Sequence, residues 1–279
     1  VNRSRHEKTI ELNGEKISAE IFCKVYKWFL SSSKTIERES LIAMMIAAEY
    51  LQIETLLKQC WELVKRVEWF QEKEAFLLYL EAKEAKIEMV QTLMRQQVKK
   101  YFLTVVATRD FLEMDADEVA NWLQMKTLGV NCEADVFFVA ARWLLYKWEE
   151  RKQHVMCLMK HVRFALLEPW RLIEYKRNEF TGELGEILKS QELRKFFEND
   201  IYYAVYRQCF KEDSEQFCDF LNRFGCKRIY QRDLVDDPHW QQTYKKSPYM
   251  FEHFRQYLVY IRSIHWKQIS YIPQKKDQK

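Results

Sequence analysis

Cysteine and histidine side chains could bind a metal ion, and their spacing along the chain indicates whether they do. The densest group comprises Cys209, Cys218, Cys226, His239 and His253. Zinc sites usually take their ligands in close pairs such as C-x2-C or H-x3-H, and none of these five residues forms such a pair. We therefore predict no metal site and interpret the group as buried free thiols and surface histidines.

Nothing else in the sequence points to catalysis or to a cofactor. No Cys-His family signature surrounds any of the seven thiols, although a nucleophilic cysteine needs a base. Phosphate-binding glycine loops, H-E-x-x-H and G-x-S-x-G are also absent. Two acidic pairs, 149–150 and 236–237, fall where a helix connection and a turn would leave them solvated rather than catalytic. We predict a non-enzyme with no catalytic residue, cofactor or metal.

The elements that hold these side chains are predicted to be helices. The 279 residues include five glycines and four prolines, and no proline precedes Pro169, which disfavours a β-rich fold with many turns. The formal charge of +4 is spread without a block of like charges, so we expect no nucleic-acid partner. The apolar runs are too short to cross a bilayer. With an odd number of cysteines and no signal peptide, a cytoplasmic or nuclear protein is expected.

Local patterns place several helices. Residues 41–48 are apolar all round, which predicts a helix buried on every side. A core-facing stripe is predicted at Ile87, Val90, Met94 and Val98.

Two helix starts are predicted from capping residues. Asp115, with Glu118 three residues later, predicts a helix through Trp122. Asn131 predicts another start, because Glu133 and Asp135 would lie in its first turn.

The stretch 131–173 contains two apolar helical patterns joined by the charged residues 149–152. One face of the first is predicted to carry Val136, Ala140, Trp143 and Leu144. This helical hairpin, the segment HVRFALLEPWRL at 161–172 and a helix at 190–207 resemble the BACK domain, over residues 64–206. The resemblance implies that His161 is a packing residue.

Residues 17–63 resemble the second half of a BTB domain. A helix that ends in an aromatic pair, a polar loop and AAEYLQI precede Cys60, and a short strand is expected at 8–12. The matching positions are Ala47, Ala48, Tyr50, Leu51, Gln52, Ile53, Leu56 and Cys60. In that family the first half supplies the homodimer interface. We interpret the chain, which begins at Val1, as a fragment, and a homodimer is expected only if that half is present.

The resemblance to BACK ends near residue 206, and no Kelch repeat follows. We predict a helix at 212–224 closed by Gly225, an extended piece at 227–234, and a last helix with Ser247 as N-cap and Pro248 in its first position. The apolar stripe of that helix is Phe251, Phe254, Leu258 and Ile261. This extension resembles those of insect BTB-BACK proteins, and disorder is expected from Gln274.

The predicted architecture is mainly α. It consists of the C-terminal part of a BTB domain (1–63), a BACK domain of helical hairpins (64–206) and a small, mostly helical extension (207–279).

The resemblance implies a protein-interaction adaptor, foremost a substrate adaptor of a cullin-3 ubiquitin ligase. The predicted cullin groove comprises Val67, Trp69, Phe70, Phe76 and Tyr79. These residues could instead close the junction between the two domains. Family members often carry a hydrophobic-x-Glu motif before the strand, and Arg5-His6-Glu7 lacks its hydrophobic residue. The alternative is a scaffold for chromatin, transcription or germline factors, independent of ubiquitin.

Capture of a substrate or partner is predicted for the extension. The candidate contact residues are Trp240, Tyr244, Tyr249, Phe251, Tyr257 and Trp266. The alternative is that the extension only packs onto BACK.

Overall fold

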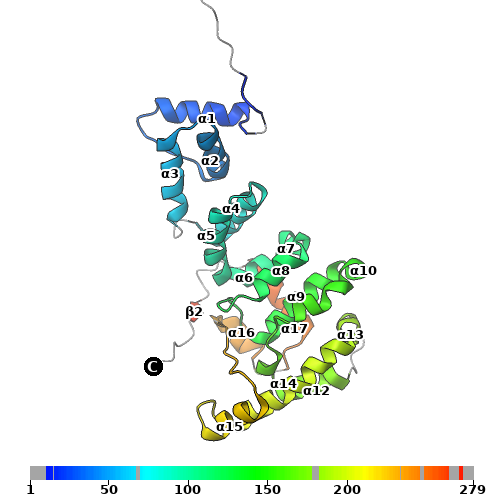
Figure 1. Cartoon of the computed structure of the whole chain (residues 1–279). Coiled ribbons are helices and arrows are strands. Elements are labelled where there is room, and N and C mark those ends of the chain that lie inside the picture. The colour runs from blue at the N-terminus through cyan, green and yellow to red at the C-terminus, as the bar shows by residue number, and fades with distance from the viewer. Residues whose placement is uncertain are drawn as a thin grey trace, which may run out of the picture. The chain divides into compact units, whose positions relative to one another are not determined.

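The computed structural model describes residues 11–14, 16–66, 70–177, 182–232, 234–245, 248–263 and 270–272. Helices make up nearly all of the regular structure in these residues (Figure 1). The chain has a mainly α fold, as predicted. By the contacts between its residues it divides into two compact units, 1–98 and 99–279. The domain boundaries predicted after residues 63 and 206 stay predictions.

The first unit is built around one buried helix. Its elements are α1 (Ala19–Leu30), η1 (Arg38–Ser40), α2 (Leu41–Tyr50), α3 (Glu54–Lys65), α4 (Glu72–Glu84) and α5 (Glu88–Val98). α2 packs against α1, α3 and α4, and α5 packs against α3 and α4. Six of the ten residues of α2 are buried, which confirms the prediction of a buried helix, and Val90, Met94 and Val98 of the predicted stripe are buried in α5. Of the predicted strand at 8–12, residues 8–10 lie outside the described residues, and Glu11 and Leu12 have no regular structure.

The second unit begins with short helices and continues into longer ones. Its elements up to residue 209 are η3 (Lys99–Tyr101), α6 (Phe102–Val106), α7 (Arg109–Glu113), α8 (Ala116–Leu123), α9 (Glu133–Tyr146), α10 (Trp148–Arg151), η4 (Lys152–His154), α11 (Val155–Met159), η5 (Phe164–Leu166), α12 (Pro169–Arg177), α13 (Glu183–Leu188) and α14 (Gln191–Cys209). α12 and α14 lie side by side (Figure 1). Ser190 caps α14 by accepting from the amide of Leu193.

Helix α9 is the centre of the second unit. Eleven of its fourteen residues are buried, far more than the single face predicted from Val136, Ala140, Trp143 and Leu144. α7, α8, α10, α11, α13 and α17 (Phe251–Ser263) all pack against it. A helix covered from so many sides cannot be recognised by one apolar stripe.

The two predicted helix starts have different outcomes. Asp115 is the N-cap of α8 and accepts a hydrogen bond from the amide of Glu118 at 2.7 Å, as predicted. Asn131 is not the N-cap of α9, because the helix begins one residue later with Cys132 in that position. The amide and side chain of Asn131 instead donate to the carboxylate of Asp135.

The predicted charged connection between the two helices is itself mostly helical. Glu149 and Glu150 are exposed, as expected, but Arg151 is buried. Its guanidinium donates to the carbonyl oxygens of Trp143 and Leu112, each at 2.7 Å, and stacks 3.9 Å from the Trp143 ring centroid. Arg151 therefore links α10 to α9 and α7.

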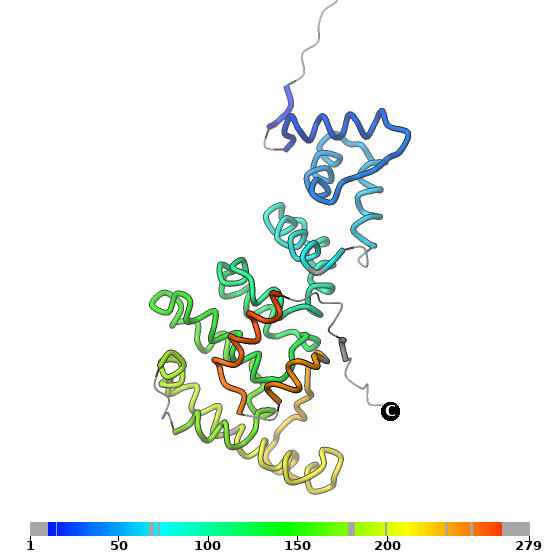
Figure 2. Tube along the Cα trace, turned by 180° about the vertical axis from the view of Figure 1, so that it is seen from behind, coloured from blue at the N-terminus to red at the C-terminus, as the bar shows by residue number. Residues whose placement is uncertain are grey.

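The described part of the C-terminal extension folds into the second unit. It contains α15 (Glu215–Phe224), β1 (Leu234–Asp236), α16 (Pro238–Thr243), α17 and β2 (Ser270–Ile272), and β1 pairs antiparallel with β2. Gly225 closes α15 with a left-handed φ of 61°, as predicted, although the helix starts three residues later than expected. Figure 2 shows α17, in orange, lying against α6 and α9.

The start of the last helix was predicted incorrectly. α17 begins at Phe251, so Pro248 precedes the helix, and Ser247 lies outside the described residues, as does the segment predicted to be disordered from Gln274. The side chain of His253 accepts from the amide of Met250 at 3.1 Å. The stripe of Phe251, Phe254, Leu258 and Ile261 is buried, as its spacing predicted.

Replacing Arg151 with lysine tests the link between α10, α9 and α7. A single ammonium cannot reproduce a planar fork that reaches two carbonyl oxygens, so we expect a loss of about 2 kcal/mol in the free energy of unfolding. Chemical denaturation measures it. The control is Lys152→Ala, whose exposed ion pair with Glu149 should contribute less than about 0.5 kcal/mol. Equal effects of the two substitutions would show that Arg151 does not form the link.

Candidate protein-interaction site

The first turn of α9 carries a buried carboxylate, Asp135, that residues from distant parts of the chain contact. It accepts hydrogen bonds from the amide of Asn131 at 2.9 Å, from the side chain of Asn131 at 3.0 Å and from the hydroxyl of Tyr249 at 2.8 Å. Burial raises the pKa of Asp135 to about 6, against the lowering effect of these bonds. The carboxylate therefore fixes the extension to α9 at one defined point.

A second buried contact joins the extension to the same turn. Glu133 and Arg232 form an ion pair at 3.1 Å, with side chains that are 5% and 2% exposed respectively. The Arg232 guanidinium also donates to the carbonyl oxygens of His161, at 2.7 Å, and of Met125, while Glu133 accepts from the amide of Arg163 at 2.8 Å. Such an ion pair is stable only when its remaining polar atoms are also satisfied, and here the backbone supplies those partners. The contact at His161 is made by its backbone, so the packing role that the resemblance implies for this residue stays a prediction.

A third contact involves α16 and α17. The hydroxyl of Tyr257 donates to Asp237 at 2.7 Å and lies 3.5 Å from the side-chain oxygen of Asn131. Asp237, predicted to be solvated, is instead 2% exposed, and it also accepts from the amide of His239 and so caps α16. We call the set Asn131, Glu133, Asp135, Arg232, Asp237, Tyr249 and Tyr257 the α9 polar network.

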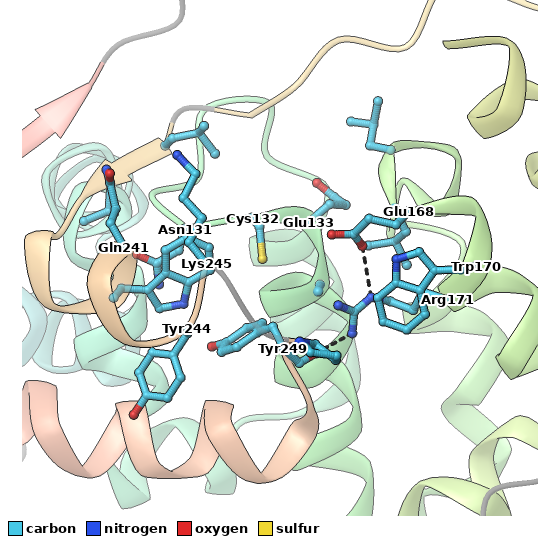
Figure 3. Close-up of a pocket in the computed structure, with 17 residues that line it drawn as sticks. Asn131, Cys132, Glu133, Glu168, Trp170, Arg171, Gln241, Tyr244, Lys245 and Tyr249 are labelled. Carbon is cyan, nitrogen blue, oxygen red and sulfur yellow. Dashed lines mark hydrogen bonds and ion pairs between the residues drawn. The ribbon is translucent and has the colours of Figure 1, made fainter. Parts of the chain in front are cut away.

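Next to this network lies a pocket of about 670 Å³, shown in Figure 3. Its wall combines the start of α9, the start of α12 and the segment from β1 to Tyr249. Four aromatic and six aliphatic residues line it, together with Cys132 and the polar or charged residues Asn131, Glu133, Glu168, Arg171, Gln241 and Lys245. A concave, largely apolar site with a few polar groups suits an apolar side chain from a bound segment.

Three of the predicted partner residues, Trp240, Tyr244 and Tyr249, meet in this pocket. Trp170 and Arg171 face them from α12 (Figure 3), and neither is among the contact residues predicted from the sequence. Trp170 is 40% exposed, whereas Arg171 is buried and donates to Glu168 at 3.1 Å and to the carbonyl oxygen of Tyr249. The proximity of Trp170 to these residues depends on tertiary packing.

The remaining predicted partner residues lie elsewhere. Phe251 and Tyr257 are buried in the interior of the second unit, where Phe251 packs 5.6 Å from Phe138 between ring centroids. Trp266 lies outside the described residues. All five described candidates are at most 8% exposed. This burial favours the alternative that the extension packs onto the preceding helices, and direct partner contact stays a prediction.

The predicted cullin groove is only partly described. Val67 and Trp69 lie outside the described residues. Phe70, Phe76 and Tyr79 are buried in the first unit, where Phe76 and Tyr79 stack with ring centroids 6.2 Å apart. Their burial agrees with the alternative that they close a junction between helices, and their role in a groove stays a prediction.

The predicted thiol and histidine group does not gather. Cys209 and Cys226 are exposed and Cys218 is half-buried, which corrects the prediction of buried thiols, because Cys209 ends α14 and Cys226 follows the C-cap of α15. Within the described ranges, no group of three or more His, Cys, Asp or Glu could hold a metal. In the pocket, burial and the nearby Asp135 raise the pKa of Cys132, which disfavours the reactive thiolate.

Comparison with known proteins identifies the helical region. The family described as "BACK: BTB And C-terminal Kelch" matches residues 75–177, which include α9 and the start of α12. The chain contains a BACK domain. The matched residues lie within the range 64–206 predicted for that domain. Separately, no helix in the described part of the chain is long and apolar enough to span a membrane.

Relatives of this BACK-containing chain are Kelch-like proteins at low identity. Kelch-like protein 26 of Mus musculus is 24% identical over 176 residues, 62% of this chain and 28% of that protein. Kelch-like ECH-associated protein 1B of Danio rerio is 22% identical over 155 residues, 56% of this chain and 26% of that protein. Kelch-like protein 35 of Homo sapiens is 36% identical over 90 residues, 32% and 15% of the two chains. The chain thus spans less than a third of these relatives.

Tyr249→Phe tests the hydrogen bond to Asp135 through its pH dependence. The pKa of Asp135 is about 6 in the folded chain, above its ordinary 3.8, so the folded state binds the proton more tightly than the unfolded state. The contribution of Asp135 to the free energy of unfolding therefore falls as the pH rises from about 3.8 through about 6. Near neutral pH the Tyr249 hydroxyl donates to an ionised carboxylate, so Tyr249→Phe should lower the free energy of unfolding by about 2 kcal/mol. Near pH 5 the carboxyl is mostly protonated, so the loss should be only about 1 kcal/mol.

Urea denaturation at the two pH values measures this difference. Tyr244→Phe is the matched control, because Tyr244 is similarly buried in the same pocket and its hydroxyl has no hydrogen-bond partner among the described residues. The control should have a small effect that does not depend on pH. A cost for Tyr249→Phe that is the same at both pH values would contradict a bond to an ionised Asp135.

Proposed function

We propose that this chain is a non-catalytic interaction adaptor and that it acts as part of a substrate adaptor for a cullin-3 ubiquitin ligase. The observation that carries the proposal is the match of the BACK domain at residues 75–177, together with its Kelch-like relatives. The division of the chain into two units also supports it, since an adaptor must hold two partners at once.

Each unit has a role in this proposal. The first unit contributes the cullin groove, with Trp69 and Phe70 as its main contacts. The second unit contributes the pocket at the start of α9, where Trp170 offers an exposed aromatic surface for a partner segment. A protein of this kind works inside the cell, in the cytoplasm or the nucleus.

One feature of the sequence favours a second function, a BTB-BACK scaffold for chromatin, transcription or germline factors. Arg5-His6-Glu7 has no hydrophobic residue where cullin-binding family members carry one. A scaffold would keep the pocket in the second unit and would not bind cullin-3. Direct titration with cullin-3 separates the two functions.

Isothermal titration of the full-length protein with the N-terminal domain of cullin-3 is the test. We expect sub-micromolar binding that weakens at least tenfold, about 1.4 kcal/mol, in the double variant Trp69→Ala, Phe70→Ala. Because Phe70 is only 8% exposed, its truncation could destabilise the fold. The melting temperature of the double variant is therefore measured, and the single variant Trp69→Ala is titrated alongside it. Phe76 and Tyr79 are unsuitable probes, since their truncation would open cavities in the core.

Trp170→Ala is the control for this titration. It removes a large, partly exposed aromatic side chain from the second unit, so cullin-3 binding should be unchanged. No detectable binding of the unmodified protein at about 50 µM would contradict the cullin role and leave the scaffold as the better proposal.

A further inference from the structure

Three arginine side chains gather where α17 lies against α9. Arg142 comes from α9, and Arg255 and Arg262 come from α17. α17 packs on both α9 and α6 (Figure 2), and the buried residues Phe254, Leu258 and Ile261 fix which of its faces points inward. The packing of apolar residues therefore holds the three arginines together, and among the described residues no carboxylate pairs with more than one of them.

Of the three arginines, Arg142 has a partly buried charge with little to offset it. Its Nε donates to the carbonyl oxygen of Val106 at 3.3 Å, and in the described part of the chain no carboxylate lies within ion-pair distance of it. A guanidinium has five N–H donors, so four remain without an acceptor among the residues that the structure describes. Arg142 is half-buried, so part of its side chain reaches solvent. Burial and the charges of Arg255 and Arg262 lower its pKa.

The outer face of α17 continues this positive surface. Arg255 pairs with Glu183 and, at 3.9 Å, with Glu252, while Arg262 is exposed and, among the described residues, has no acidic partner. Arg255, Val259 and Arg262 are spaced four and three residues apart, so they share one face of the helix. Val259, between the two arginines, is 69% exposed.

We propose that Arg142, Val259 and Arg262 form a docking surface for an acidic segment of a partner protein. Two open guanidinium forks would each take a carboxylate through paired hydrogen bonds, and Val259 would contact an aliphatic side chain between them. The central apolar residue and the small number of free arginines favour a peptide over the regularly spaced phosphates of a nucleic acid. This surface uses neither the predicted cullin groove nor the pocket.

Fluorescence anisotropy of the whole chain with a labelled peptide of Glu-Glu-Leu repeats tests the proposal. We expect saturable binding that weakens at least tenfold in Arg262→Gln and further in Arg142→Gln, Arg262→Gln. Binding should also weaken with added salt. The counterpart peptide of Gln-Gln-Leu repeats should not bind. Since Arg262 is exposed, its single variant retains the fold and keeps the test decisive if the double variant does not.

Arg223→Gln is the matched control, because it removes one positive charge from an exposed position on α15 of the same unit. It should leave peptide binding unchanged. The proposal fails if Arg223→Gln and Arg262→Gln weaken binding equally, if the acidic peptide does not bind, or if a duplex DNA oligonucleotide binds more tightly through the same arginines. No cullin is used, so this outcome is independent of the cullin-3 titration.

Discussion

The second unit depends on the need to satisfy the polar groups buried at the start of α9. Glu133 and Asp135 lie in the first turn of a helix that is covered on almost every side. A buried carboxylate without partners would destabilise the fold by several kcal/mol. The partners are Arg232 and Tyr249, which come from about a hundred residues further along the chain. The helices between residues 99 and 209 and the extension are therefore parts of one folded body.

This arrangement shapes the surface that a partner could meet. Because Tyr249 is held by Asp135, and Arg171 donates to the carbonyl oxygen of Tyr249, the wall of the pocket is fixed before any partner arrives. A preformed site binds with a smaller entropic cost than one that must become ordered. The buried aromatic residues of the extension thus support the wall of the pocket, and Trp170 is its partly exposed aromatic side chain.

The sequence predicted the local features of the fold well. The N-cap at Asp115, the buried helix at 41–48 and the closure of α15 at Gly225 depend on neighbouring residues, and each is present. The long-range features were missed. Nothing near Arg151 in the sequence indicates that its buried guanidinium would donate to two backbone carbonyl oxygens. The pattern around Asn131 predicts an N-cap, whereas its role as a donor to Asp135 depends on where the helix begins.

Native-state hydrogen exchange of the amides in α9 and α17 tests most directly whether these segments form one body. If the α9 polar network unites them, both helices should exchange through the same cooperative opening, with free energies that agree within about 1 kcal/mol. The account would be contradicted if the amides of α17 opened with a free energy more than about 2 kcal/mol below that of α9, because the extension would then be a separately folding segment.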